Sequence, residues 1–477
     1  MDFFVKLANW LWGPPILILI VGGGLIISLR TGFFQIRYLP FILKETFGKM
    51  FSKETEGEGT VSAFQAMTTA LASSIGAANI VVVPTIIFAA GPGAVFWMWV
   101  AAIVGQATKF GEVALGIKYR KTNKDGDFVG GACYYLKEGI GGNLGKIIGA
   151  FTAFFFMIEI FPSITLQTLS AAGAIEMMGS SFGMANTGLI KTIAIIAIFI
   201  LTSLVVHGGV KAIGEVTEKL VPFMAVIYLV FGAIILAMNF SAIPGAFKMI
   251  IVGAFNPKAV VGGVGGATLK AIIQNGIARG VYSNEAGMGS APYGHAAATT
   301  DHPARQGLWG CFEVIVDTLI VCTVSALLVL TTGVWNPEMS AAEMKAVSPV
   351  AIERVFNSSF GSIGSLVLSV CLFLFVMSTI IVIAFYTDKL GEYLFGTKAG
   401  NIIRWLSTFM IILAIFLSFD NAGTFLDITL GLVVIPNMIG LVMMSGQIKD
   451  LKNDFFNNPE FYPGAKKSKL KGAPSKN

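Results

Sequence analysis

Apolar segments long enough to cross a membrane recur along almost the whole chain. About 20 apolar residues in a helix match the hydrocarbon thickness of a bilayer. Of the 477 residues, 55% are hydrophobic and only 13% are charged, too few charges to cover a soluble protein of this size. Eleven segments can be marked, at residues 12–30, 61–90, 94–117, 145–177, 188–206, 217–238, 262–284, 305–333, 361–386, 402–418 and 423–446.

These segments predict the fold class and the domain organisation. We expect an all-α integral membrane protein with about 11 transmembrane helices in one domain, residues 1–446, followed by a basic cytoplasmic tail, residues 447–477. The pattern lacks the short alternating strands of a lipid-spanning barrel. The lipid bilayer is the expected surrounding, and the sequence suggests no obligate protein partner.

Lysine and arginine lie mostly on one side of the expected membrane. Alternate loops and the tail carry 25 of the 33 basic residues, whereas the loops of the opposite side carry six. Because basic loops stay in the cytoplasm, we expect a multi-pass plasma-membrane protein with its N-terminus outside and its C-terminus cytoplasmic. The same distribution accounts for the net charge of +6 without a nucleic-acid partner.

Other function classes find little support. The cysteines, Cys133, Cys311, Cys322 and Cys371, form no C-x-x-C pair and the three histidines are scattered, which argues against a metal centre or a disulfide framework. An intramembrane enzyme would need clustered acids or a His/Ser pair at a cleft, and the acids are scattered. A channel, which stays a remote alternative, would need a filter-like ring of carbonyls or charges.

One expected span carries small and polar residues at mid-membrane. Residues 71–84 read LASSIGAANIVVVP, with two serines, a glycine and an asparagine inside an apolar segment. Close helix packing is one interpretation, since Ala72 and Gly76 have the small-xxx-small spacing. Asn79 and Pro84 favour the other, a helix that is discontinuous at about 72–80.

The spans also suggest an internal symmetry. With the first span, 12–30, set aside as an extra helix, ten remain, or two sets of five at 61–238 and 262–446. Five is odd, so consecutive sets must have opposite topology, as in transporters built from inverted repeats. The first span of the second set contains QNGIARG, which predicts a matching discontinuity at 274–280.

Interrupted helices expose backbone groups that something must satisfy. Each unpaired group in the bilayer costs several kcal/mol. A half-helix N-terminus can bind a carboxylate through free N–H groups, and freed carbonyls with Ser or Thr hydroxyls can coordinate sodium. An amino acid and a cation would together use both ends of such a break, which favours a secondary transporter.

Several charged residues fall inside the expected spans. Glu159, Glu313 and Asp317 are intramembrane acids, which are functional by default but could simply pair within the bundle. Lys109 and Glu112 lie near the end of the third span, where we expect a structural ion pair or snorkelling side chains.

Three uncharged polar residues complete the candidates. Gln167 lies four residues after Ser163, beside the kink expected at Pro162, and could face a site. Ser378 and Thr379 supply hydroxyls in an apolar span, where such groups usually bond back to the preceding turn.

Five segments of the chain are characteristic of a known family. They are GPGAVFWMWVAAIVGQATKFGE (91–112), FVGGACYYLKEGIG (128–141), EVTEKLVPFMAVIYLV (215–230), NGIARGVYSNEAGMGSAP (275–292) and RQGLWGCFEVIVDTLIVCT (305–323). Through them the chain resembles the alanine or glycine:cation symporters, also called sodium:alanine symporters. The resemblance runs from the first span to about residue 446, and its most specific parts are FWMW and SNEAGMGSAP. The family is similar in fold to LeuT-type transporters, with five-plus-five inverted repeats and one extra N-terminal helix.

The resemblance implies roles for individual residues. It implies sodium as the coupling ion, held by the carbonyls of Ala72 and Ile75 and the hydroxyls of Ser378 and Thr379. It implies an amino-acid substrate whose carboxylate meets the first break and whose ammonium meets carbonyls at the second. The implied substrate residues are Ser74, Gly76, Ala77, Ala78, Asn79, Gln167, Asn275, Gly276 and Ile383.

The chain departs from the family pattern inside the implied site. It has GAANIVV at 76–82 where the family usually has GTGNIAG, and Ile383 stands where a tryptophan is usual. The resemblance therefore implies sodium-coupled uptake of a small neutral amino acid of the alanine or glycine class. The departures leave open a different amino acid, or coupling to protons instead of sodium.

Overall fold

The computed structural model describes residues 2–50, 57–124, 126–184, 186–256, 268–417 and 419–465. Within these ranges, nine helices are long and apolar enough to cross a membrane, and one bent pair of helices would make a tenth. The all-α class is confirmed, whereas the predicted count of eleven spans is not. The predicted seventh span, 262–284, begins among residues 257–267, which lie outside the described residues.

An N-terminal group of helices precedes the two predicted repeats. Phe3–Thr31 forms one near-continuous span, to which the extra helix predicted at 12–30 belongs. A short connector then leads to the first break. The elements of the N-terminal group are α1 (Asp2–Leu11), α2 (Pro14–Leu17), the π-helical η1 (Ile18–Gly22), α3 (Gly23–Thr31), α4 (Phe34–Arg37), α5 (Leu39–Glu45) and the 3-10 helix η2 (Phe47–Lys49).

The first half of the remaining chain is a run of long helices. Ser62 begins it with a capping box, in which the Ser62 hydroxyl accepts from Gln65 N and the Gln65 side chain accepts from Ser62 N. The elements are α6 (Ala63–Ser74), η3 (Ala78–Val82), α7 (Val83–Ala90), α8 (Gly93–Lys118), β1 (Lys121–Thr122), β2 (Phe128–Val129), α9 (Ala132–Tyr135), η4 (Leu136–Ile140), α10 (Gly142–Ser181), α11 (Thr187–Val206) and α12 (Gly209–Met238).

The second half begins after the connecting helix α13 (Ile243–Phe255) and contains a similar series of helices. The elements from Phe240 onward are η5 (Phe240–Ala242), α13, α15 (Leu269–Asn284), α16 (Ala291–His295), α17 (Pro303–Val314), η6 (Ile315–Cys322), α18 (Thr323–Thr331), α19 (Ala341–Val347), η7 (Ser348–Val350), α20 (Ala351–Phe360), α21 (Ser362–Phe395), α22 (Thr397–Leu413), η8 (Ala414–Phe416), α23 (Phe419–Met443) and α24 (Ser445–Asn457). In each half a broken helix is followed by a long, a longest, a shorter and a long one, the order expected of two repeats.

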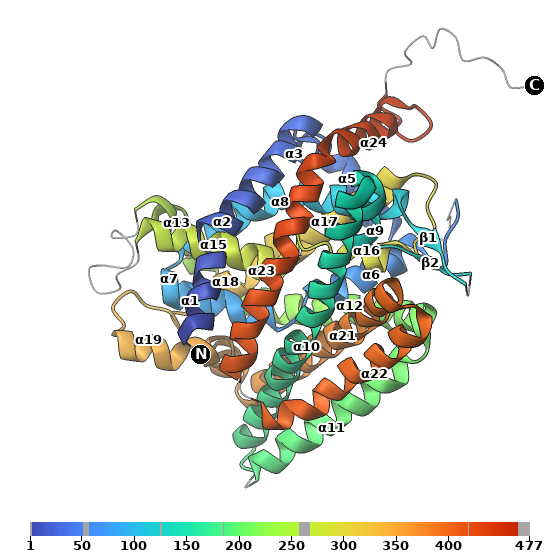
Figure 1. Ribbon diagram of the computed structural model, residues 1–477. Helices are drawn as coiled ribbons and strands as arrows, with labels where there is room; N and C mark the ends of the chain where they lie inside the picture. The colour runs from blue at the N-terminus through green and yellow to red at the C-terminus, as the bar shows by residue number, and fades with distance from the viewer. Residues whose placement is uncertain are drawn as a thin grey trace, which may run out of the picture.

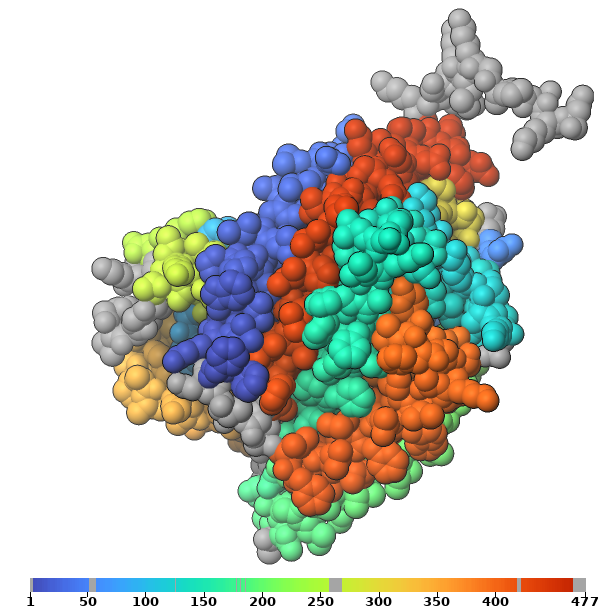
Figure 2. Space-filling model, viewed as in Figure 1, coloured from blue at the N-terminus to red at the C-terminus, as the bar shows by residue number. Residues whose placement is uncertain are grey.

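Helices of the two halves pack against each other. α8 packs on α17, α10 on α21 and α11 on α22, so corresponding members of the two sets are neighbours (Figure 1). The N-terminal span lies along α23, and α23 lies along α10, as the blue, red and teal bands of Figure 2 show. The site described below therefore lies inside a bundle to which both halves contribute.

The predicted break at 72–80 is confirmed. α6 ends at Ser74, Ile75 is extended with φ −77° and ψ 95°, and the chain resumes as η3 at Ala78. The two parts, Ala63–Ser74 and Ala78–Ala90, are bent by 49° relative to each other.

The predicted break at 274–280 is wrong, because α15 runs unbroken from Leu269 to Asn284. Gly276 serves helix packing instead: a Cβ there would clash with the carbonyl of Ala94 and the side chain of Trp97 on α8. The chain leaves helical geometry five residues after 280. Glu285 has φ 56°, and Gly287 and Gly289 have φ 99° and 75°, before α16 begins at Ala291.

Candidate functional site

A narrow cavity lies between the break in α6–α7 and the break between α15 and α16. It has a volume of about 30 Å³, room for a few water molecules, so an amino acid can enter only if the walls move. α6, η3, α10 and α21 form the walls together with the second break. The lining residues are Ser73, Ser74, Ala78, Phe156, Glu159, Ser163, Gln167, Tyr282, Glu285, Met288, Ser290, Thr379, Ile383 and Tyr386.

The predicted sodium residues come together beside this cavity. The Thr379 hydroxyl lies 2.9 Å from the carbonyl oxygen of Ala72 and 3.4 Å from that of Ile75. α6 ends between these two residues, so neither carbonyl accepts a regular helical bond. Ser378 is also fully buried, and its hydroxyl donates to the carbonyl of Phe375 at 2.8 Å, a carbonyl that lies 3.0 Å from the Thr379 hydroxyl as well. Oxygens from a broken helix and a neighbouring hydroxyl are the donor set that suits a hard monovalent cation.

Asn79 closes the break rather than lining the cavity. Its Oδ1 accepts a hydrogen bond from the backbone N–H of Gly76 at 3.1 Å. Its Nδ2 donates to Asp317 Oδ1 at 2.6 Å and to Ser283 Oγ at 3.0 Å. Because both ends of the amide are engaged, Asn79 joins the first break to α15 and η6 and leaves no free group for a substrate.

Gln167 reaches the break from the opposite wall. A Cβ added to Gly76 would lie 3.1 Å from Gln167 Nε2 and 3.0 Å from Thr379 Oγ1, so a larger residue would require these side chains to shift. Gln167 Oε1 is buried and has no hydrogen-bond partner among the described residues. An unpartnered acceptor beside a broken helix is the kind of group that a polar ligand satisfies.

The structure brings only part of the predicted substrate set to the cavity. Ser74, Ala78, Gln167 and Ile383 line it, and Gly76 and Ala77 are buried in the break itself. Asn275 and Gly276 do not line it. Asn275 donates to the carbonyl of Ala271 at 2.8 Å, one turn back on the unbroken α15, and Gly276 faces α8. Their place at the second break is taken by residues from Tyr282 to Ser290.

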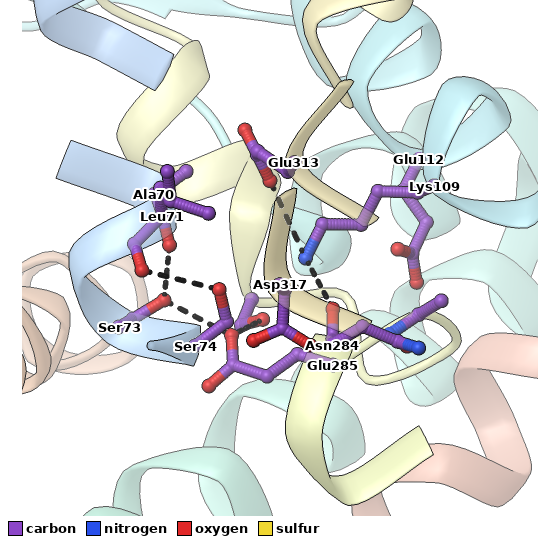
Figure 3. A network of polar contacts seen from close by, with 12 residues as sticks. Ala70, Leu71, Ser73, Ser74, Lys109, Glu112, Asn284, Glu285, Glu313 and Asp317 are labelled. Carbon is purple, nitrogen blue, oxygen red and sulfur yellow. Dashed lines mark hydrogen bonds and ion pairs between the residues drawn. The ribbon is translucent and has the colours of Figure 1, made fainter. Parts of the chain in front are cut away.

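Glu285 joins the two breaks, a role that sequence reasoning missed. Its Oε2 accepts from Ser73 Oγ of α6 at 3.0 Å and from Ser290 Oγ at 2.5 Å, and Figure 3 shows the Ser73 contact. The signal that could have revealed it is an acid followed by two glycines in SNEAGMGS, which directly follows the helix where the second break was predicted.

Lys109 and Glu112 do not form the predicted ion pair with each other. Both are fully buried, so neither snorkels. Lys109 Nζ lies 3.5 Å from Glu313 Oε2 and donates to the carbonyl of Asn284 at 3.0 Å (Figure 3). Glu112 Oε1 instead accepts from the N–H groups of Gly287 and Gly289 at 3.1 and 2.8 Å. One turn of helix separates the two side chains, and each fixes a different part of the second break.

The other intramembrane acids differ in their surroundings. Glu313 also bonds to His295, and Asp317 accepts from Asn79, Ser283 and Thr318, so both pair within the bundle. Glu159 lines the cavity and has no hydrogen bond or ion pair to any described residue.

Comparison with known proteins shows extensive similarity. The model of the sodium:alanine symporter family matches residues 1–467. An uncharacterized transporter, YflA of Bacillus subtilis (strain 168), is 43% identical over 96% of this chain and 93% of its own. The sodium/alanine symporter AgcS of Methanococcus maripaludis is 39% identical over 94% of this chain and 96% of its own.

A further relative and a solved structure are also similar to this chain. The probable sodium/glutamine symporter GlnT of Bacillus subtilis is 30% identical over 95% of this chain and 91% of its own. Among solved structures, MhsT in complex with L-phenylalanine superposes with a TM-score of 0.57 over 83% of this chain and 98% of its own, at 12% identity. That likeness shows the fold alone, which is the LeuT fold.

Proposed function

The chain belongs to the sodium:alanine symporter family, and from this premise we propose that it carries a small neutral amino acid into the cell together with sodium. The observation that carries the proposal is the contact of Thr379 with the free carbonyls of Ala72 and Ile75 at the break in α6–α7. These three oxygens, with Ser378 beside them, would hold the sodium ion.

The substrate would sit in the adjacent cavity. Thr379 both belongs to the proposed sodium site and lines the cavity, so ion and substrate would share a wall. The N–H groups at the start of η3 and the amide of Gln167 would receive the substrate's carboxylate, because N–H groups at a helix start and a side-chain amide are donors that suit a carboxylate. Ile383 would border the substrate's side chain.

Coupling to sodium would make the uptake concentrative. One cation moving down ~100 mV contributes about 2.3 kcal/mol. A tenfold cation gradient adds about 1.4 kcal/mol. Together these support roughly 500-fold accumulation of a neutral substrate. The distribution of basic residues supports a plasma-membrane orientation with the N-terminus outside and the C-terminus in the cytoplasm.

A second candidate is a symporter of a different amino acid, or one coupled to protons. Ile383 at the cavity wall and the GAANIVV sequence at the break support it, since both change the shape of the implied site. AgcS is described as a sodium/alanine symporter and GlnT as a probable sodium/glutamine symporter, so the descriptions of the relatives name more than one substrate.

Uptake of labelled alanine into proteoliposomes, with and without an inward sodium gradient, tests the proposal. Accumulation that needs the sodium gradient is the expected result. Accumulation driven by a proton gradient in sodium-free buffer would favour the second candidate instead. Sodium-dependent thermal stabilisation without alanine uptake would point to a symporter of another substrate.

A further inference from the structure

Both charged residues that line the cavity are acids. Glu159 of α10 and Glu285 of the second break are 4% and 8% exposed. Lys109 lies nearby but is engaged by Glu313 and the carbonyl of Asn284. Two carboxyl groups in a space of low dielectric therefore face the cavity, and none of the described residues that line it is a cation.

The two acids are satisfied to different degrees. Glu285 accepts hydrogen bonds from Ser73 and Ser290. Glu159 has no partner among the described residues, although it is almost fully buried. Gln167 Oε1 is a second buried acceptor without a partner on the same wall. Unsatisfied buried acceptors that face one cavity are costly unless a ligand donates to them.

Glu159 lies some distance from the break, whereas Glu285 bonds to Ser73 at the end of α6. Glu159, Ser163 and Gln167 all line the cavity and are spaced four residues apart on α10. This spacing puts Glu159 about 12 Å along the helix from Gln167, and helical side chains lean toward the N-terminus of their helix. The α-ammonium of an amino acid held at the break by its carboxylate would not reach Glu159.

A second amino group on the substrate would reach it. In amino acids such as ornithine or lysine, the terminal amine lies roughly 6–8 Å from the carboxylate carbon when the chain is extended. The charges also favour such a group. If both acids are ionised, a zwitterion adds no net charge and sodium adds one positive charge, so one of the two acids lacks a counter-charge unless it takes up a proton or meets a second amine.

We propose that Glu159 and Glu285 form an amine subsite, so that the protein also accepts amino acids with an amine at the end of a short side chain. This rests on the proposed function, because the substrate's carboxylate is taken to lie at the break. Glu159 carries the specificity, and Glu285, fixed by its two serines, supplies the second carboxylate.

Competition between labelled alanine and labelled ornithine in proteoliposomes tests the subsite. Wild-type protein should take up ornithine, and each substrate should inhibit uptake of the other competitively. Glu159→Gln keeps the size of the side chain and removes its charge, and should lower the ornithine-to-alanine ratio of uptake efficiency by about tenfold or more. Glu159→Asp should keep part of the preference.

Glu176→Gln is the matched control on the same helix. Glu176 pairs with Lys191 at 3.6 Å at the surface, and this change should leave the ratio as it is in wild type. Thermal melting of each purified variant, with and without ornithine, shows whether a lower ornithine-to-alanine ratio reflects weaker ornithine binding or a poorly folded protein. The wild type and Glu159→Asp should be stabilised by ornithine more than Glu159→Gln.

One result would overturn the subsite, a second would show what the acid binds instead, and a third would separate the subsite from the proposed coupling. If alanine uptake is sodium-driven but ornithine neither competes nor stabilises, the subsite is wrong and the proposed function stands. If, in addition, Glu159→Gln abolishes a proton flux that accompanies alanine uptake, the acid binds a proton instead. If ornithine uptake depends on Glu159 but not on sodium, the subsite stands and the proposed coupling fails.

Discussion

The hydroxyl of Thr379 lies 2.9 Å from the carbonyl oxygen of Ala72, although 307 residues separate them in the chain. The contact joins α21 to the broken end of α6, and so joins the two halves of the molecule. A carbonyl freed by a helix break would be costly in a membrane without such a partner. The same arrangement would offer a cation oxygen ligands from both halves at once.

Asn79→Ala should abolish transport and destabilise the fold. The change leaves the N–H of Gly76 without its acceptor and removes a donor from Asp317. Each buried group left unsatisfied costs about 1–3 kcal/mol. Alanine uptake, together with the melting temperature in detergent, measures both effects. Normal transport by this variant would show that the break does not need Asn79 to hold its shape.

Gly76→Ala should weaken both substrate and sodium binding. A Cβ there would press on Gln167 Nε2 at 3.1 Å and on Thr379 Oγ1 at 3.0 Å, and would push the two walls apart. Gly173→Ala, in α10, is the control, because a Cβ at Gly173 meets no atom within 4 Å. Concentration dependence of uptake on alanine and on sodium should change only in the first variant. Equal behaviour of the two would argue against close contact at the break.

Gly276→Ala should lower stability rather than substrate affinity. α15 is continuous there, and the added Cβ would meet the backbone of Ala94 in α8. Overpacking of this kind costs about 1–3 kcal/mol. The expected result is a lower melting temperature, with an unchanged Michaelis constant in the protein that remains folded. An unchanged melting temperature with a raised Michaelis constant for alanine would indicate that Gly276 belongs to the substrate site, as the resemblance implied.

Lys109→Met should be strongly destabilising. It leaves Glu313 buried without its cation and the carbonyl of Asn284 without its donor. Removal of one partner of a buried ion pair costs about 3–5 kcal/mol. Lys121→Met is the control, because Lys121 and Glu138 form an exposed pair at 4.0 Å, a type worth about 0–1 kcal/mol. Similar melting temperatures for the two variants would mean that the buried contacts of Lys109 do not stabilise the fold.

The first break could be predicted from sequence because its polar residues are conspicuous. Serines, a glycine and an asparagine interrupt an apolar span at 73–79, and few structures other than a break use them together. The resemblance implied that Thr379 acts together with Ala72 and Ile75, and in the structure its hydroxyl lies 2.9 and 3.4 Å from their carbonyl oxygens.

The second break was misplaced because two kinds of glycine look alike in sequence. Gly276 lies in a helix and permits close packing, whereas Gly287 and Gly289 have positive φ and form the break. Contacts between residues far apart in sequence could not be predicted either. The contact of Ser73 with Glu285 spans 212 residues, and nothing local to either residue shows it.

The sodium dependence of alanine uptake tests most directly whether Thr379 and the first break hold the coupling sodium. The sodium concentration for half-maximal uptake should rise about tenfold or more in Thr379→Ala and stay near the wild-type value in Thr379→Ser. Thr408→Ala is the control, since Thr408 is a buried threonine that bonds back to Arg404 on α22. Unchanged sodium dependence in a folded Thr379→Ala protein would contradict the account.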